Sequence, residues 1–297
     1  MGEGMTQTRA TAIGFGAVLL WALLALFTAA SAPAPPLLLN ALCFALGGGL
    51  GMIWAAARGR LGLLARVPLG VYAFGTAGLF GYHFFYFSAL RLAPPAEAGL
   101  IAYLWPLLIV LFSGLLPGER LRTGHVVGAG LAFAGAAILL AGRAEAPSGA
   151  WAGYGFAALC ALTWSGYSVL SRRLGAVPTE AVAVFCLASA ALSALAHLAV
   201  EAPAWPVGLT GWAAVAALGL GPVGLAFYLW DIGVKRGNIQ LLGTASYAAP
   251  LLSTLALVAA GFAAPTPSLA LAALLITGGA ALAARAGRGR INPPKAG

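Results

Sequence analysis

The chain has 297 residues, of which 61% are hydrophobic and 8% are charged, and its formal net charge at pH 7 is +9. This composition excludes a water-soluble globular protein, because so few charged side chains cannot cover a soluble surface. It does not indicate nucleic-acid binding either, since the positive charge is divided among short segments between long apolar stretches, where basic residues set membrane topology and meet anionic lipid headgroups.

Ten apolar stretches follow one another along the chain. Most are close to the ~20 residues that a helix needs to cross the hydrocarbon core of a bilayer. In chain order they are Ala10–Ala30, Leu37–Ala57, Pro68–Leu90, Ala96–Leu116, Thr123–Ala141, Trp151–Arg172, Thr179–Val200, Gly211–Val234, Ile239–Phe262 and Pro267–Ala284. The sequence therefore predicts an all-α integral membrane protein with ten transmembrane helices in a lipid bilayer.

The basic residues fall mainly on one side of this predicted arrangement. With the N-terminus placed inside, 14 of the 16 Lys and Arg residues lie on the inner side, and only Arg91 and Arg143 lie outside. Short loops rich in Lys and Arg stay in the cytoplasm. We therefore expect a multi-pass protein of the cell (inner) membrane with both termini in the cytoplasm.

An internal repeat divides the chain into two halves. The run Tyr103-Leu104-Trp105-Pro106-Leu107-Leu108 recurs 144 residues later as Tyr247-Ala248-Ala249-Pro250-Leu251-Leu252. The predicted halves, residues 1–145 and 146–297, meet in the polar segment 143–149 and hold five apolar stretches each. Since five is odd, the second copy inserts upside down, which predicts the 5+5 inverted-topology repeat of many secondary transporters.

Residues Gly99 to Gly142 resemble the signature half of the drug/metabolite transporter superfamily, EamA type. The apolar run after Pro106 ends in Pro117-Gly118-Glu119-Arg120, and a helix rich in small residues follows. The second half has Gly261-Phe262 where the first has its Gly-Glu pair. Glu119 is therefore expected to be a loop or helix-cap residue rather than a ligand for a transported ion.

The resemblance covers essentially the whole chain, and the aromatic third and fourth stretches are similar to the branch of aromatic amino-acid exporters. It implies a secondary transporter that exports aromatic and other neutral amino acids and related metabolites. The expected mechanism is facilitative alternating access through a central aromatic-lined cavity. A broad-specificity drug or nucleoside exporter, with or without proton coupling, is the alternative. We expect no enzymatic activity, no cofactor and no bound metal, and the sequence does not predict the oligomeric state.

A channel would need a continuous polar lining, and an enzyme would need a clustered set of acids, bases or metal ligands. Neither is visible along these stretches, and the scattered His83, His197 and Asp231 do not form such a set at helical spacing. Asp231 is expected to pair with Lys235, four residues on. Because no Lys or Arg lies deep in a stretch, strongly anionic cargo is disfavoured. A neutral or zwitterionic small molecule moving down its own gradient fits best.

Aromatic side chains within the apolar stretches are the candidate substrate contacts. They are Trp21, Tyr82, Tyr86, Tyr103, Trp105, Trp164, Tyr247 and Trp230, the last of which is the repeat partner of Tyr86, with His83 expected to orient the polar end of the substrate. Trp21, Tyr82, Trp105, Trp164 and Tyr247 lie too deep for the interfacial belts, where such rings usually sit. Rings of this kind stack on an aromatic side chain and bind an ammonium group over their faces. Ordinary core packing is the competing interpretation of the same residues.

Two prolines and two rows of small residues complete the predictions. Pro106 and Pro250 lack a backbone donor and are the predicted hinges of two gate helices. Small residues recur every four positions in the fifth and tenth stretches. Close helix approach is what this spacing favours, so we expect these helices to lie away from the cavity, as packing elements or as an oligomer contact.

Overall fold

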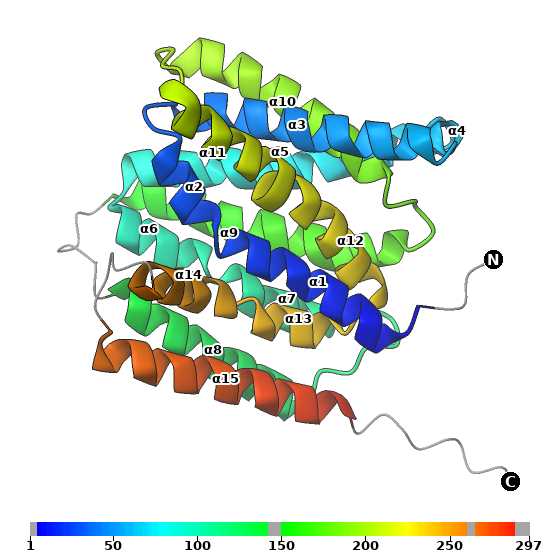
Figure 1. Cartoon of the computed structure of the whole chain (residues 1–297). Helices are drawn as coiled ribbons and strands as arrows, with labels where there is room; N and C mark the ends of the chain where they lie inside the picture. Colours follow the sequence, from blue (N-terminus) through cyan, green and yellow to red (C-terminus); the bar gives the residue numbers. More distant parts are fainter. Residues whose placement is uncertain (1–4, 142–149, 260–264, 289–297) are drawn as a thin grey trace, which may run out of the picture.

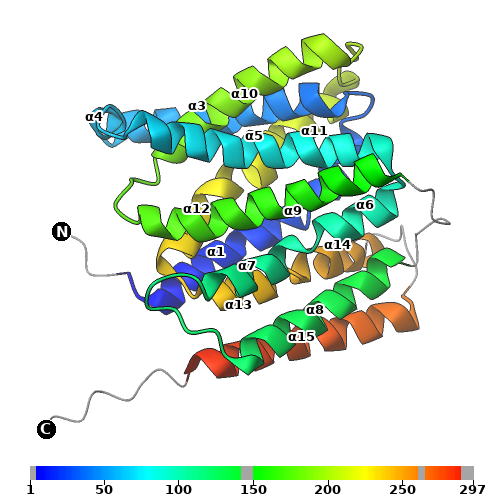
Figure 2. The same cartoon turned by 180° about the vertical axis from the view of Figure 1, so that it is seen from behind.

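The computed structural model describes residues 5–141, 150–259 and 265–288. Over these ranges the chain is helical and contains no β-strand, so the prediction of an all-α protein is confirmed. The helices lie side by side in one bundle (Figures 1 and 2). The predicted boundary at 143–149 and the Gly261-Phe262 pair lie outside the described residues.

The helices of the first half cover its five predicted stretches. They are α1 (Gln7–Trp21), α2 (Leu24–Ala30), α3 (Pro36–Ala57), α4 (Leu61–Leu64), α5 (Leu69–Leu92), α6 (Pro95–Ala102), α7 (Trp105–Ser113) and α8 (Thr123–Ala141). Of these, α4 is a single turn in the link between α3 and α5.

The helices of the second half cover the other five stretches. They are α9 (Trp151–Ser171), the 3-10 turn η1 (Arg172–Leu174), α10 (Ala181–Val200), α11 (Gly208–Leu220), the π-helical segment η2 (Gly221–Leu225), α12 (Ala226–Arg236), α13 (Ile239–Ala245), α14 (Ala248–Ala259) and α15 (Pro267–Arg288). By length and composition, five helical segments in the described ranges are apolar and long enough to cross a membrane.

Four of the predicted stretches are interrupted in the described structure. The interruptions lie between α1 and α2, between α6 and α7, at η2, and between α13 and α14. Pro106 and Pro250 stand in the first turns of α7 and α14, directly after two of them. A proline ring clashes with the carbonyl four residues earlier. The helix before each proline therefore ends at about that residue.

Contacts between the two halves build the bundle. The fifth helices of the two halves, α8 and α15, pack along each other at one edge of the bundle (Figures 1 and 2). At the opposite edge the second helices, α3 and α10, do the same. Between these edges α1 packs on α12, α5 on α9 and α7 on α13. All of these pairs join one half to the other, so the hydrophobic core is shared between the halves.

Glycines allow the closest of these approaches. A Cβ atom added to Gly128 of α8 would lie 2.5 Å from the carbonyl oxygen of Gly279 in α15. A Cβ atom added to Gly14 of α1 would lie 2.8 Å from the Cα atom of Gly233 in α12. The small residues of the fifth and tenth stretches thus allow α8 and α15 to pack closely on each other.

The start of α1 and the end of α15 lie at the same end of the bundle (Figure 1). The end of α3, the link from α7 to α8, and the ends of α9 and α12 lie there as well. These segments carry the described basic residues except Arg91, which ends α5 at the other end of the bundle.

Candidate functional site

Four indole rings meet in the middle of the fold, and we call them the tryptophan cluster: Trp21, Trp105, Trp164 and Trp230. Each ring contacts the other three, with centroid separations that run from 5.1 Å for Trp21 and Trp230 to 6.4 Å for Trp105 and Trp164. These separations lie in the range in which aromatic rings attract one another. Two of the rings come from each half of the chain.

The ends of helices and two hydrogen bonds position these rings. Trp21 is the last residue of α1 and Trp105 the first residue of α7, so each stands beside an interruption. The Trp21 indole N–H donates to the carbonyl oxygen of Pro222 in η2, at 3.1 Å. The Trp230 indole N–H donates to Oγ of Ser168 in α9, at 3.0 Å. A buried indole needs such a partner to avoid the loss of its hydrogen bond to water.

Side chains of α5 extend the cluster on one side. The ring of Tyr82 lies 5.3 Å from that of Trp164, and Tyr86 stacks on Tyr82 with a centroid separation of 6.1 Å. His83 is buried, and its Nδ1 atom lies 2.8 Å from the carbonyl oxygen of Leu79. Phe227 of α12 contacts both Trp164 and His83, at 5.7 Å and 6.0 Å.

Tyr103 and Tyr247 belong to a different group of side chains. The ring of Tyr247 is fully buried and lies 5.9 Å from that of Phe133, and Tyr103 packs against the same apolar cluster. The Tyr247 hydroxyl oxygen accepts a hydrogen bond from the backbone N–H of Leu107, at 3.1 Å. The structure therefore brings most of the predicted aromatic residues together but holds Tyr247 apart from the indoles.

Glu201 joins three helices at the Arg91 end of the bundle, and the sequence analysis did not single it out. Its side chain is 1% exposed and pairs with Arg91 at 2.6 Å. It also lies 2.9 Å from Nδ1 of His197, which is buried, and accepts the backbone N–H of Leu37 in the first turn of α3. The spacing of four residues between His197 and Glu201 is the one signal in the sequence that points to this pair.

Ionic pairs at the opposite end match two predictions. Lys235 pairs with Asp231 at 2.8 Å, as its spacing predicts. Glu119 pairs with Arg172 at 2.8 Å and accepts a hydrogen bond from the side-chain amide of Gln240. Arg172 also donates to two backbone carbonyls near the end of α12. Glu119 thus links the α7–α8 segment to the second half, as expected of a structural loop residue.

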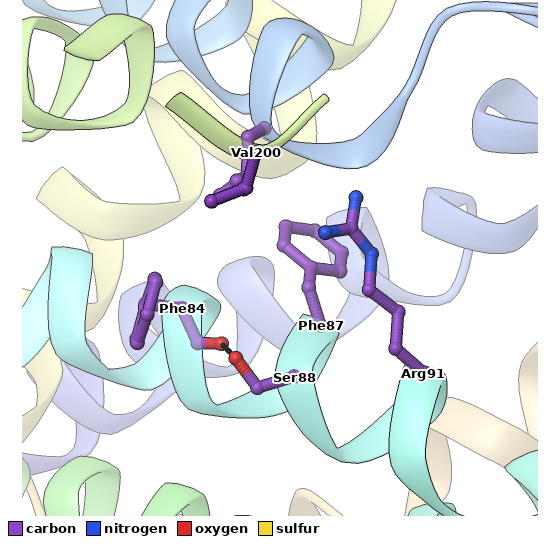
Figure 3. Close-up of a pocket in the computed structure, with 6 residues that line it drawn as sticks. Phe84, Phe87, Ser88, Arg91 and Val200 are labelled. Atoms are coloured by element: carbon purple, nitrogen blue, oxygen red, sulfur yellow. Dashed lines mark hydrogen bonds between the residues drawn. The ribbon is translucent and has the colours of Figure 1, made fainter. Parts of the chain in front are cut away.

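A pocket with a volume of about 170 Å³ lies beside Glu201 (Figure 3). Its lining consists of Leu37, Phe84, Phe87, Ser88, Arg91 and Val200. Phe84 follows Tyr82 by two residues, and Ser88 follows Tyr86 by two residues. Two residues turn a helix by about 200°, so Phe84 and Ser88 project from roughly the side of α5 opposite to these tyrosines. This pocket therefore faces α3 and the end of α10, away from the tryptophan cluster.

Comparison with known proteins finds relatives that match most of the chain. The sequence profile of the EamA-like transporter family matches residues 8–141 and 151–285, one copy in each half. The aromatic amino acid exporter YddG of Ancylobacter novellus is 61% identical over 284 residues, which cover 94% of this chain and 98% of that protein. The protein of the same name from Escherichia coli is 27% identical, over 94% of this chain and 97% of its own length. A crystal structure with 59% identity superposes with a TM-score of 0.91 and covers 95% of this chain and 100% of its own.

Proposed function

This chain belongs to the EamA-like transporter family, and on that premise we propose that it exports aromatic amino acids across the cell (inner) membrane. It is a multi-pass membrane protein by family and by its apolar helices. The relative that is 61% identical over nearly the whole of both chains is named an aromatic amino acid exporter. That identity supports the transfer of the substrate class to this chain.

The tryptophan cluster is the observation that carries the proposal. Its four indoles come from α1, α7, α9 and α12, two from each half of the molecule. An aromatic side chain between these rings would gain edge and face contacts. The ammonium group of an amino acid would lie favourably over a ring face. Uncharged rings also suit a zwitterion better than a substrate with a net charge.

We assign the substrate contacts to the tryptophan cluster together with Tyr82 and Tyr86, which lie beside it, and with Tyr103, two residues before Trp105. His83 orients the polar end of the substrate in this account. The indoles contact one another in the present conformation, so a substrate enters only when helices of the two halves separate. The interruptions before Pro106 and Pro250 are the proposed hinges of that movement, which exposes the site to one side of the membrane at a time.

The proposed topology has ten spans in a 5+5 inverted repeat. Two features support it. First, α1 and its repeat counterpart α9 run in opposite directions through the bundle (Figure 1). Second, the packing is reciprocal, because the first helix of each half packs on the third helix of the other: α1 on α12 and α9 on α5. In this proposal the end of the bundle that carries most basic residues, and both termini with it, faces the cytoplasm; the usual retention of Lys- and Arg-rich loops on that side supports the assignment.

Uptake into proteoliposomes tests the substrate class. Purified protein is reconstituted, and uptake of radiolabelled phenylalanine, threonine and uridine is followed with and without an imposed pH gradient. Saturable phenylalanine uptake without the gradient is the expected result. Uptake of uridine alone would overturn the substrate class and favour a nucleoside exporter. Strict dependence on the gradient would replace facilitated transport by proton coupling.

A further inference from the structure

The start of α7 is capped by a residue of the other half. Backbone N–H groups in the first turn of a helix have no partner within that helix. Leu104 precedes α7 and contributes no side-chain cap, and Pro106 has no N–H to donate. The N–H of Leu107 donates instead to the hydroxyl oxygen of Tyr247, at 3.1 Å. The two residues are 140 positions apart.

The position of Tyr247 in the chain makes this contact informative. It lies between α13 and α14, in the interruption that corresponds by repeat to the one before α7. Its side chain is 0% exposed and packs with Phe133 of α8 and Leu269 of α15. A ring enclosed in this way holds its hydroxyl group at a fixed place, because the ring cannot turn away without breaking its packing against Phe133 and Leu269.

A close backbone approach reinforces the same junction. A Cβ atom added to Gly243 of α13 would lie 3.0 Å from the carbonyl oxygen of Pro106 and 3.0 Å from a methyl group of Val110. α13 therefore lies directly against the first turns of α7. The start of α7 thus meets the second half at two residues, Gly243 and Tyr247.

Trp105 depends on this junction because it is the first residue of α7. Its ring contacts the other three indoles of the tryptophan cluster. Any shift or rotation of the first turn of α7 moves that ring relative to the others. A residue that fixes the first turn thus controls the shape of the proposed substrate site from a distance.

We propose that Tyr247 is a positioning residue for transport: its hydroxyl group, bound to the Leu107 N–H, joins the two matching helix interruptions and holds Trp105 in its substrate-binding place. This inference rests on the function proposed above, and it assigns Tyr247 a role without substrate contact. It also explains how the two halves share one site, since a movement at one interruption is passed to the other through this bond.

The test compares Tyr247→Phe, which removes the hydroxyl group and keeps the ring, with Tyr72→Phe. The Tyr72 hydroxyl, in the first turn of α5, donates to the carbonyl oxygen of Leu64 in α4, so the control loses a hydrogen bond that lies away from the junction. Two quantities are measured for each protein: the hydrogen-exchange rate of the Leu107 amide by mass spectrometry, and the KM and maximal rate of phenylalanine uptake into proteoliposomes.

In Tyr247→Phe we expect amide exchange at Leu107 about tenfold faster and a KM about tenfold higher, the size of effect that the loss of one hydrogen bond produces. The maximal rate per folded molecule should change less, and Tyr72→Phe should match the wild type in both quantities. A loss of stability alone would lower the maximal rate and leave the KM unchanged, and that result would overturn the inference.

Unchanged exchange at Leu107 would also overturn it, because the bond would then not protect the start of α7. The failure of the proposed function has a different signature, namely no saturable phenylalanine uptake by the wild-type protein. An unchanged KM in Tyr247→Phe, with a wild-type protein that transports, contradicts only the role of Tyr247.

Discussion

Trp21 ends α1 and donates from its indole nitrogen to the carbonyl oxygen of Pro222, 3.1 Å away. The interruption after α1 therefore meets the π-helical segment η2 of the other half. Together with the bond between Tyr247 and Leu107, this contact arranges the four interruptions of the described chain in two pairs, each joined across the halves by one hydrogen bond.

Trp21→Phe keeps an aromatic ring in the cluster and removes the donor to Pro222. The midpoint of thermal unfolding in detergent should fall, because a hydrogen bond of this kind contributes about 1 kcal/mol. Trp205→Phe is the control, since Trp205 is 54% exposed and lies between α10 and α11. Equal midpoints for the two variants would mean that the bond from Trp21 adds nothing to stability.

Gly279 and Gly278 are neighbours in α15 that should respond to alanine in opposite ways. A Cβ atom at Gly279 would collide with the carbonyl oxygen of Gly128 and lie 3.0 Å from the backbone nitrogen of Ala132, whereas a Cβ atom at Gly278 meets nothing within 4 Å. Gly279→Ala should cost about 1–3 kcal/mol through overpacking. Gly278→Ala should be neutral or stabilise by up to about 1 kcal/mol, because alanine favours a helix more than glycine does. Thermal unfolding of both variants checks the difference.

The interruptions show how far the sequence predicts this fold. Those before Pro106 and Pro250 follow from local chemistry, because proline cannot continue the preceding helix. The interruption after Trp21 has no proline or glycine of its own, and the partner of Trp21 lies 201 residues away. Contacts between distant segments decide such a feature, so the sequence pattern alone does not predict it.

Only part of the candidate site could be predicted from the sequence, because contacts between distant segments also decide which of its side chains meet. Depth within an apolar stretch identified Trp21, Trp105 and Trp164, and the repeat identified Trp230; these four indoles do meet. Depth also identified Tyr247, which packs elsewhere. Depth does not say which way a side chain faces. Glu201 was missed because a carboxylate just beyond a helix end resembles an ordinary loop residue, and its partners on α3 and α5 come together only in the folded bundle.

Glu201→Ala should lower the thermal midpoint more than Arg91→Ala does. Glu201 is buried and also accepts the N–H of Leu37, whereas the Arg91 side chain is 44% exposed. Breaking a buried ionic pair costs about 3–5 kcal/mol, and a partly exposed arginine loses less. The double variant completes a cycle, in which Arg91→Ala should have little further effect once Glu201 is absent. Additive losses would contradict a direct coupling.

Membrane topology can be read from cysteine labelling. The native cysteines Cys43, Cys160 and Cys186 are buried, so background labelling should be low. Arg66→Cys lies in the link between α3 and α5, and Trp205→Cys lies in the link between α10 and α11, at the opposite end of the bundle. A membrane-impermeant maleimide should label Trp205→Cys in intact cells and Arg66→Cys only after permeabilisation. The reverse pattern would place both termini outside.

The most direct test of the substrate site is phenylalanine uptake by Trp105→Ala, measured per folded molecule in proteoliposomes beside the wild type and Trp151→Ala. Trp105 is buried among the other indoles, whereas Trp151 is 79% exposed at the start of α9. We predict that Trp105→Ala loses transport while the folded protein is still recovered, and that Trp151→Ala transports like the wild type. Wild-type flux through Trp105→Ala would contradict the account, because the tryptophan cluster would then not be the substrate site.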